Sequence, residues 1–519
     1  MGVQDEALRL ILGLLDSMAS QNQALQFRLD AALRQLWSRK SEKVSPDQLA
    51  LFLAKLPPVE STPAGQAESS AKEAEAPASQ ESTEQSGSQE PARSRPKKRA
   101  FPPDLPRRRE EVRVPDEERW CACGREKTFI GHEVQTLWEF VPGSFHLLER
   151  CREKLACKKC EEEGVTTAPA PGKPIDGGRP GPGLLAQIVT AKEHDSLPLY
   201  RQSQIYERSG IHLAPSTLGD WHAVAADMYE PVYEILKAQT LGRYLLSLDD
   251  TPMPVLDRED PRGVCKGRIW TYLGDFDQIG FCEYTKTWEG EAPRELLAQS
   301  KAKVVQGDGY AGIDRHFSGP DPPRRAGCND HCRRKFVKAM QAGDARAALV
   351  VEIYRHLYAV EAEAVDKKLD ANARLTLRTE KSRPLFERLH RVISELHRVA
   401  VPKSPLGKAT TYAIRQWPTL GVFLDDGRVP ISNAHVERQQ RRTALGRKNY
   451  LFAGSHDGAR RLAILQTVAV NCDILGISMW HYLRDVFARI ADRLPRARYG
   501  ELTPQSWAAA QKAQQADAH

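Results

Sequence analysis

The chain has 519 residues and carries 75 Lys and Arg against 68 Asp and Glu, a net charge of +7. This length exceeds one hydrophobic core, so we expect several domains, and the mildly basic balance is compatible with nucleic acid without requiring it. No run of about 18 apolar residues occurs, and the apolar segment 8–15 is short and lacks a basic start. We therefore expect a cytoplasmic protein with no membrane span, signal peptide or membrane partner.

Residues 1–50 are predicted to contain a coiled-coil helix. Apolar side chains repeat every seven residues in two registers, and Asn22 interrupts one of them, as a core Asn does where it specifies register and strand number. The alternative is an amphipathic helix that lies on its own domain. Because a polar linker follows, a homo-oligomer is the preferred interpretation. The registers are Leu8, Leu15, Asn22, Leu29 and Leu36, and Ile11, Met18, Leu25 and Ala32.

Residues 51–118 are predicted to be a disordered linker. They are rich in Pro, Ser, Glu and Gln and contain almost no aromatic residue, so they bury too little surface to fold. The second half becomes basic at 93–99 and again at 107–109. This basic arm is predicted to lie along phosphates, with a merely solvated run of charge as the alternative.

Residues 119–165 are predicted to form a zinc-binding module. Four of the ten cysteines occur in two close pairs, Cys121 with Cys123 and Cys157 with Cys160. Facing pairs of this kind supply the four thiolates of a closed tetrahedral zinc site, which stabilises a small domain and does no chemistry. The alternative is that these are unligated surface thiols.

Residues 184–240 are predicted to form a helix-turn-helix. Gly210 supplies the left-handed position that ends one helix, and Pro215 starts the next, with Ser216 in its first turn. In a DNA-binding protein the second helix would enter a major groove. A plain helical hairpin gives the same signals.

The region 241–475 begins with an apolar run, Tyr244 to Leu248, that reads as a buried strand ending in two carboxylates, Asp249 and Asp250. Prolines follow at 252 and 254, so we expect regular pairing to end just past these acids. Because neighbouring side chains of a strand point to opposite faces, the two carboxylates are not expected to face one site.

The remaining elements predict an α/β multidomain protein with a mixed sheet. The elements that follow have the ribonuclease H order. They are strands at 268–274 and 279–285, a helix at 293–302, and a strand at Val304 and Val305 that leads to Asp308. Residues 344–425 read as a helical insertion, and a helix from Asn433 returns Glu437 to the sheet. Residues 476–519 complete the chain as a C-terminal tail.

These residues resemble the bacterial insertion-sequence transposases of family sixty-six over about 115–510. The family usually has Asp-Glu-Thr where this chain has Asp249-Asp-Thr251, and Asp-Asn-Asn-x-x-Glu where it has Ser432-Asn-Ala-His-Val-Glu437. The resemblance rests on the zinc knuckles, the helix-turn-helix, Leu248-Asp-Asp-Thr-Pro252, Gly307-Asp-Gly-Tyr-Ala-Gly312, Cys328-Asn-Asp-His331, and above all Ala444-Leu-Gly-Arg-Lys-Asn-Tyr-Leu-Phe-Ala-Gly-Ser455.

The resemblance implies a DDE-type transposase that cleaves element ends and transfers strands. Asp249, Asp308 and Glu437 are then the catalytic triad, and their hard oxygen ligands suit two magnesium ions. Cys328 and His331 resemble a pair the family carries and are expected to support the site, or else to be a buried structural pair. Residues expected to contact DNA are Ser216, Arg438, Arg441, Arg442, Arg447 and Lys448, with solvated helix charge as the alternative for each basic one.

The expected partners are double-stranded DNA of the element ends and target, other copies of the chain, and companion proteins of the same element. Such a protein would be associated with the bacterial nucleoid. Two other functions are compatible with the sequence: a catalytically silent DNA-binding regulator derived from a transposase, and a hydrolytic nuclease on the same core. Magnesium-dependent cleavage separates the regulator from the other two, and strand joining separates transposase from nuclease.

Overall fold

The structure is a computed structural model that describes residues 180–517, apart from 277, 319 and 320, and short pieces between 143 and 178. Every helix and strand discussed below belongs to the compact unit that includes Phe145–His519. The predicted coiled coil, the linker and the four cysteines predicted to bind zinc lie outside the described residues. Two short antiparallel strands, β1 (Lys154–Ala156) and β2 (Val165–Thr167), precede the main fold.

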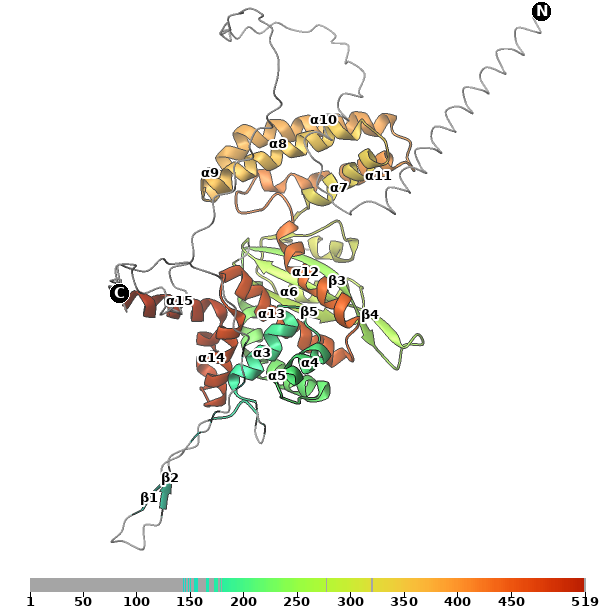
Figure 1. Cartoon of the computed structure of the whole chain (residues 1–519). Helices are drawn as coiled ribbons and strands as arrows, with labels where there is room; N and C mark the ends of the chain where they lie inside the picture. Colours follow the sequence, from blue (N-terminus) through green and yellow to red (C-terminus); the bar gives the residue numbers. More distant parts are fainter. Residues whose placement is uncertain are drawn as a thin grey trace, which may run out of the picture. The chain divides into compact units, whose positions relative to one another are not determined.

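A five-stranded mixed sheet organises the described region (Figure 1). Its order is β5-β4-β3-β6-β7, in which β3 pairs antiparallel with β4, β4 antiparallel with β5, and β6 and β7 run parallel to β3. Apolar side chains alternate along β3, so that Leu246 and Leu248 enter one core layer while Leu245 and Met253 enter others. The strands are β3 (Leu245–Leu256), β4 (Val264–Gly274), β5 (Ile279–Thr285), β6 (Val304–Gln306) and β7 (Arg324–Ala326).

Strand β3 is longer than predicted. It continues through Pro252 and Pro254 to Leu256 and stays paired with β4 throughout. The expected early end was wrong because the polar groups of these prolines face away from β4. The carbonyl oxygen of Pro254 accepts the N–H of Ala453 at 2.9 Å, and that of Pro252 accepts a hydrogen bond from Arg447. A missing N–H on that side removes no bond from the ladder.

Helices from both ends of the described chain cover the sheet face that carries Leu246 and Leu248. Tyr229 and Leu236 of the long helix α5 are fully buried there beside Phe281 of β5. Apolar burial of this kind is the main favourable contribution to folding. The helices that contribute to this core or lie beside it are α3 (Pro182–Glu193), α5 (Pro215–Leu241), α6 (Glu291–Ala298), α13 (His456–Leu475), α14 (Met479–Ala491) and α15 (Pro504–Asp517).

The two helices expected around Gly210 are present as α4 (Leu199–Arg208) and α5. Gly210 has a φ of +78°, a conformation that side chains rarely allow. Leu218 in the first turns of α5 packs against Tyr206 of α4, whereas the later turns of α5 belong to the core under the sheet. The helix pair is therefore built into the main fold.

Residues between β7 and α12 (Ala434–Tyr450) are largely helical and pack together (Figure 1). Arg378, in a π-helical turn at Arg378–Ser382, is completely buried; it donates two 2.7 Å hydrogen bonds to Glu361 and further bonds to the carbonyl oxygens of Phe423, Asp426 and Val429. These contacts tie the insertion to the segment that leads to α12. The helices are α7 (Asn329–Gln341), α8 (Ala347–Asp366), α9 (Ala371–Leu377), α10 (Arg383–Val399) and α11 (Pro405–Leu420).

Side chains of α13 satisfy the open edge of β5. Asn471 accepts a hydrogen bond from the N–H of Gly280 and donates one from Nδ2 to the carbonyl oxygen of the same residue, and Thr467 Oγ1 accepts the N–H of Cys282 at 2.9 Å. A covered edge presents no template for pairing with another chain. Among the described residues, no helix is both long and apolar enough to cross a membrane.

Candidate active site

Parallel pairing of β3 with β6 brings two acidic residues to the same edge of the sheet. The register pairs Ser247 with Gln306, and Asp249 and Asp308 each follow this pair by two residues. Asp308 lies directly beyond β6, where the backbone N–H of Tyr310 donates to its Oδ1 at 3.0 Å. Strand register therefore makes neighbours of two carboxylates that are far apart in the sequence.

The third acid, Glu437, is in the first turn of α12 (Ala434–Tyr450). Asn433, at the N-cap, donates from Nδ2 to the carbonyl oxygen of Leu248 at 2.8 Å, and its N–H donates to Sγ of Cys328 at 3.2 Å. Glu437 follows Asn433 by four residues, which places it on the same side of the helix start. These bonds hold Glu437 beside the part of β3 that carries Asp249.

The pKa of Asp249 shows that the three acids act on one another. Burial and then the charges of Asp308 and Glu437 raise the pKa of Asp249 to about 8, far above the ordinary value of an aspartate. Carboxylates at close range disfavour each other's ionised form, and a bound cation reverses that preference. The site thus gathers negative charge that a metal ion would neutralise.

Asp250 has a different environment. It receives hydrogen bonds from Arg268 Nε and, at 3.3 Å, from Trp288 Nε1. The Arg268 guanidinium lies 4.7 Å from the Trp288 ring centroid, and that ring stacks on Tyr310. Asp250 is therefore held by Arg268 and Trp288, as the alternation of side chains along β3 predicts for the neighbour of Asp249.

Helix α7 supplies the groups that surround Glu437. Arg334 donates to Oε2 of Glu437, and Nδ1 of His331 lies 3.6 Å from its Oε1. Cys328, just before α7, is buried, and burial raises the pKa of its thiol to about 12. Candidate ligand atoms of Cys328, His331 and Glu437 all lie within 4.8 Å of one another. The structure thus brings the predicted supporting pair to the third acid.

The residues present fit a hard divalent cation. Asp249, Asp308 and Glu437 offer only carboxylate oxygens, the donors that Mg²⁺ prefers. Oε1 of Glu437 is buried and has no hydrogen-bond partner among the described residues. Among the described residues, ligand atoms of the three acids do not all lie within 4.8 Å of one another.

The residues predicted to contact DNA fall into two groups. Arg438, Arg441 and Lys448 are exposed on α12, and Ser216 is exposed in the first turn of α5. The other two basic residues make contacts inside the fold. Arg442 forms an ion pair with Asp473, and Arg447 donates to Thr251 Oγ1 at 3.3 Å and to the carbonyl oxygen of Pro252.

Sequence reasoning did not identify three residues at this site. Arg334 was not singled out, although its place three residues after His331 puts both on one face of α7. Asn433 was read as the start of a helix, and its bond to Leu248 has no local signal. Trp288 contacts Asp250 from a loop that carried no motif.

Two family models match the chain. Residues 177–461, more than half of the chain, match the family described as "Transposase IS66 family". Residues 24–109 match one described as "Transposase C of IS166 homeodomain".

Three proteins of Sinorhizobium fredii (strain NBRC 101917 / NGR234) are similar to the chain, and each is described as uncharacterized. Protein y4hP is 32% identical over 511 residues, which cover 93% of this chain and 88% of the relative. Protein y4jD is 32% identical over 80% of this chain and 83% of its own length, and y4qI is 31% identical over 76% and 75%. The chain belongs to the IS66 family of transposases.

Proposed function

We propose that the chain is a DDE-type transposase that cleaves the ends of its insertion sequence and joins them to target DNA. The observation that carries the proposal is the convergence of Asp249, Asp308 and Glu437, with the pKa of Asp249 raised by the other two carboxylates. The element order adds support, because three antiparallel strands, a helix and a further strand are the order of a ribonuclease H-like core.

In this proposal the three acids hold two Mg²⁺ ions. Bound in this way, such ions activate an attacking oxygen and stabilise a leaving oxygen in phosphoryl transfer. The protein itself would position these carboxylate ligands before the metal ions bind. The N–H of Tyr310 orients Asp308, and the sheet register sets Asp249 beside it.

In this proposal four neighbouring residues keep Glu437 in position: Asn433, Arg334, His331 and Cys328. Asn433 fixes the start of α12 against β3, and Arg334 and His331 hold the carboxylate from the opposite side. Cys328 is a buried partner of the Asn433 N–H. Residues of this kind orient metal ligands and are needed for full affinity.

DNA recognition is assigned to two kinds of contact. The helix pair α4 and α5, with Ser216 at the exposed start of α5, would read the element ends in a groove. The basic arm at 93–109 and the basic residues of α12 would contact phosphates, which position the protein without reading sequence. The α12 residues that remain available for this role are the exposed Arg438, Arg441 and Lys448, because Arg442 and Arg447 make contacts inside the fold.

Two further parts of the proposal concern residues outside those the structure describes. Cys121, Cys123, Cys157 and Cys160 would bind one structural zinc ion, and the heptads of 1–50 would join two or more copies. Spacing and periodicity of the sequence support both. The working assembly would act on nucleoid DNA, with companion proteins of the element as possible members.

The decisive experiment compares Asp249→Asn with Asp250→Asn in the full chain, on duplex DNA carrying the element's own ends. We expect the first variant to lose both magnesium-dependent nicking and strand joining, because the three acids act as a unit, while Asp250→Asn keeps both. DNA binding is the control and should survive in both variants. Normal joining by Asp249→Asn would refute the assignment. A wild-type chain that only binds DNA would indicate a regulator, and one that nicks without joining a nuclease.

A further inference from the structure

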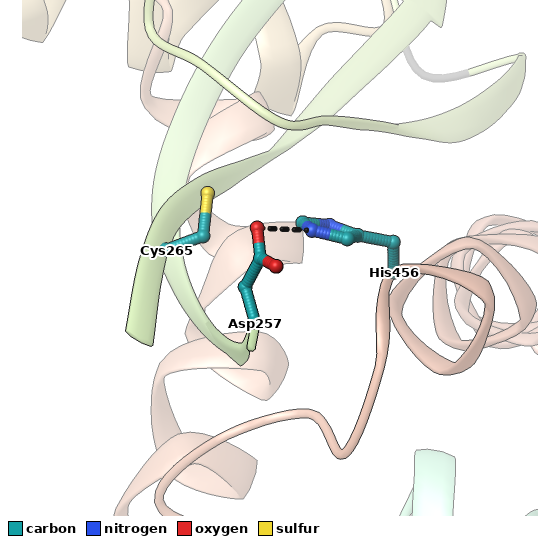
Figure 2. A group of neighbouring side chains, drawn as sticks. All are labelled: Asp257, Cys265 and His456. Atoms are coloured by element: carbon teal, nitrogen blue, oxygen red, sulfur yellow. Dashed lines mark hydrogen bonds and ion pairs between the residues drawn. The ribbon is translucent and has the colours of Figure 1, made fainter. Parts of the chain in front are cut away.

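A second group of metal-ligating side chains lies at the far end of the β3–β4 hairpin. Asp257 follows β3, Cys265 lies on β4, and His456 is the first residue of α13 (Figure 2). Asp257 is eight residues beyond Asp249, which is about 26 Å along an extended strand. The group is therefore separate from the three acids of the candidate active site.

The sheet register explains why Asp257 and Cys265 point the same way. Val255 pairs with Cys265, so their side chains share a face, and Asp257 lies two residues further along that face. The segment after α12 runs alongside this end of β3, because Ala453 forms an isolated parallel bridge with Val255. His456 follows three residues later and is thereby brought over the hairpin.

The three side chains converge closely. Nε2 of His456 lies 2.9 Å from Oδ2 of Asp257, and the candidate ligand atoms of all three residues lie within 4.8 Å of one another (Figure 2). Their side chains are partly buried, with exposed fractions of 17% for Asp257 and 22% for His456. Water can therefore reach the group and complete a coordination shell.

We propose that Asp257, Cys265 and His456 bind a zinc ion that fastens the β3–β4 hairpin to the start of α13. One carboxylate oxygen, one thiolate and one imidazole nitrogen form a mixed donor set typical of zinc, and a water completes four ligands. The carboxylate and thiolate together balance the two charges of the ion. The thiol must lose its proton, and its hydrogen bond to the carbonyl oxygen of Lys286, when the metal binds.

Tyr284 completes the arrangement. Its hydroxyl lies 2.7 Å from Nδ1 of His456, so its oxygen can accept a hydrogen bond from the Nδ1–H and leave the Nε2 lone pair directed at the site. Metal-bound histidines regularly have such a partner on the other nitrogen. The Lys286 ammonium opposes cation binding at this site, since its positive charge also acts on Asp257 and Cys265.

The test uses the full chain stripped of metal and titrated with Zn²⁺ or Co²⁺ alone. Alkylation of Cys265, followed by peptide mass spectrometry, reports on this one thiol, whatever the other cysteines bind. We expect Zn²⁺ to protect Cys265 from alkylation in the wild type and in the control variant Glu259→Gln, which changes an exposed acid of the same hairpin. Protection should be lost in Asp257→Asn and in His456→Gln.

The metal stoichiometry gives a second measurement. Cys265→Ser and His456→Gln should each retain one Zn²⁺ fewer than the wild type, and His481→Gln, which changes an exposed histidine at the start of α14, should retain the same number. Tyr284→Phe should weaken Zn²⁺ binding about 10-fold. Unchanged alkylation of wild-type Cys265 at saturating Zn²⁺ would overturn the proposal, as would equal metal content in the wild type and Cys265→Ser. The first readout needs no substitution, so it decides the question even where a variant fails to fold.

Discussion

The side-chain amide of Asn433 donates a 2.8 Å hydrogen bond to the carbonyl oxygen of Leu248, the residue immediately before Asp249. Both partners are buried, and 185 residues separate them in the chain. This bond joins the helix that carries Glu437 to the strand that carries Asp249. The relative position of two of the three acids therefore depends on it.

Asn433→Ala should damage catalysis and stability together. The substitution leaves the buried carbonyl oxygen of Leu248 unpaired, which costs about 1–3 kcal/mol, and it loosens α12 at Glu437. We expect a lower urea midpoint and at least a 10-fold loss of magnesium-dependent nicking, the size seen when residues that orient metal ligands are removed. Asn449→Ala is the matched control, because Asn449 makes the same kind of bond to the carbonyl oxygen of Ser196 away from the acids. Equal nicking by the two variants would contradict the positioning role.

The raised pKa of Asp249 predicts how stability depends on pH without metal. The folded chain keeps a proton on Asp249 up to about pH 8, whereas the unfolded chain releases it near the ordinary aspartate pKa of about 4. The folded state therefore binds more protons in this window, and stability contributed by this group falls as pH rises from about 4 to about 8. Above about pH 8 both states have released this proton, so Asp249 no longer makes stability depend on pH.

This prediction is measured by urea unfolding of the full chain in a chelator across that pH range. Asp249→Asn should remove most of the slope, a difference on the order of a few kcal/mol between the ends of the window. Asp260→Asn is the control, since the pKa of Asp260 is lowered to about 2 and its titration falls outside the window. Parallel slopes in wild type and Asp249→Asn would show that Asp249 does not titrate as stated.

Arg378 should be far more important for stability than a surface arginine. Arg378→Met leaves Glu361 and the buried carbonyl oxygens of Phe423 and Val429 without their donor, and breaking a buried ion pair costs about 3–5 kcal/mol. Arg383→Met is the matched control, because Arg383 pairs with the exposed Asp425, and such surface pairs contribute about 0–1 kcal/mol. Denaturant midpoints of the two variants test the difference, and similar midpoints would refute it.

Arg441 and Arg442 are neighbours with different expected roles. Arg441 is exposed, so Arg441→Ala should weaken binding to all DNA sequences and reduce the salt slope by about 1, as the loss of one phosphate contact does. Arg442 already pairs with Asp473, so Arg442→Ala should mainly lower thermal stability. Fluorescence anisotropy over a salt series separates the two effects. An unchanged salt slope in Arg441→Ala would remove it from the DNA surface.

Local patterns predicted much of the core. The apolar run before Asp249, the glycines around Asp308 and the helical start at Asn433 are signals contained within a few residues, and the structure has a strand, a strand end and a helix there. The same is true of Gly210, whose positive φ ends a helix where expected. The length of β3 was misjudged because proline was treated as a local stop, although its effect depends on which side of the strand the missing N–H faces.

The sequence by itself determined the element types, the acids at the strand ends, the family resemblance and the alternation that separates Asp249 from Asp250. Only the tertiary structure decided which groups meet: the register of β3 with β6, the bond from Asn433 to Leu248, the contacts of Arg334 and Trp288, and the convergence of Asp257, Cys265 and His456. Strand and helix signals arise from neighbours within one or two turns of the chain, so a sequence displays them directly. Contacts between separate elements arise from packing the whole core, and no local pattern encodes them.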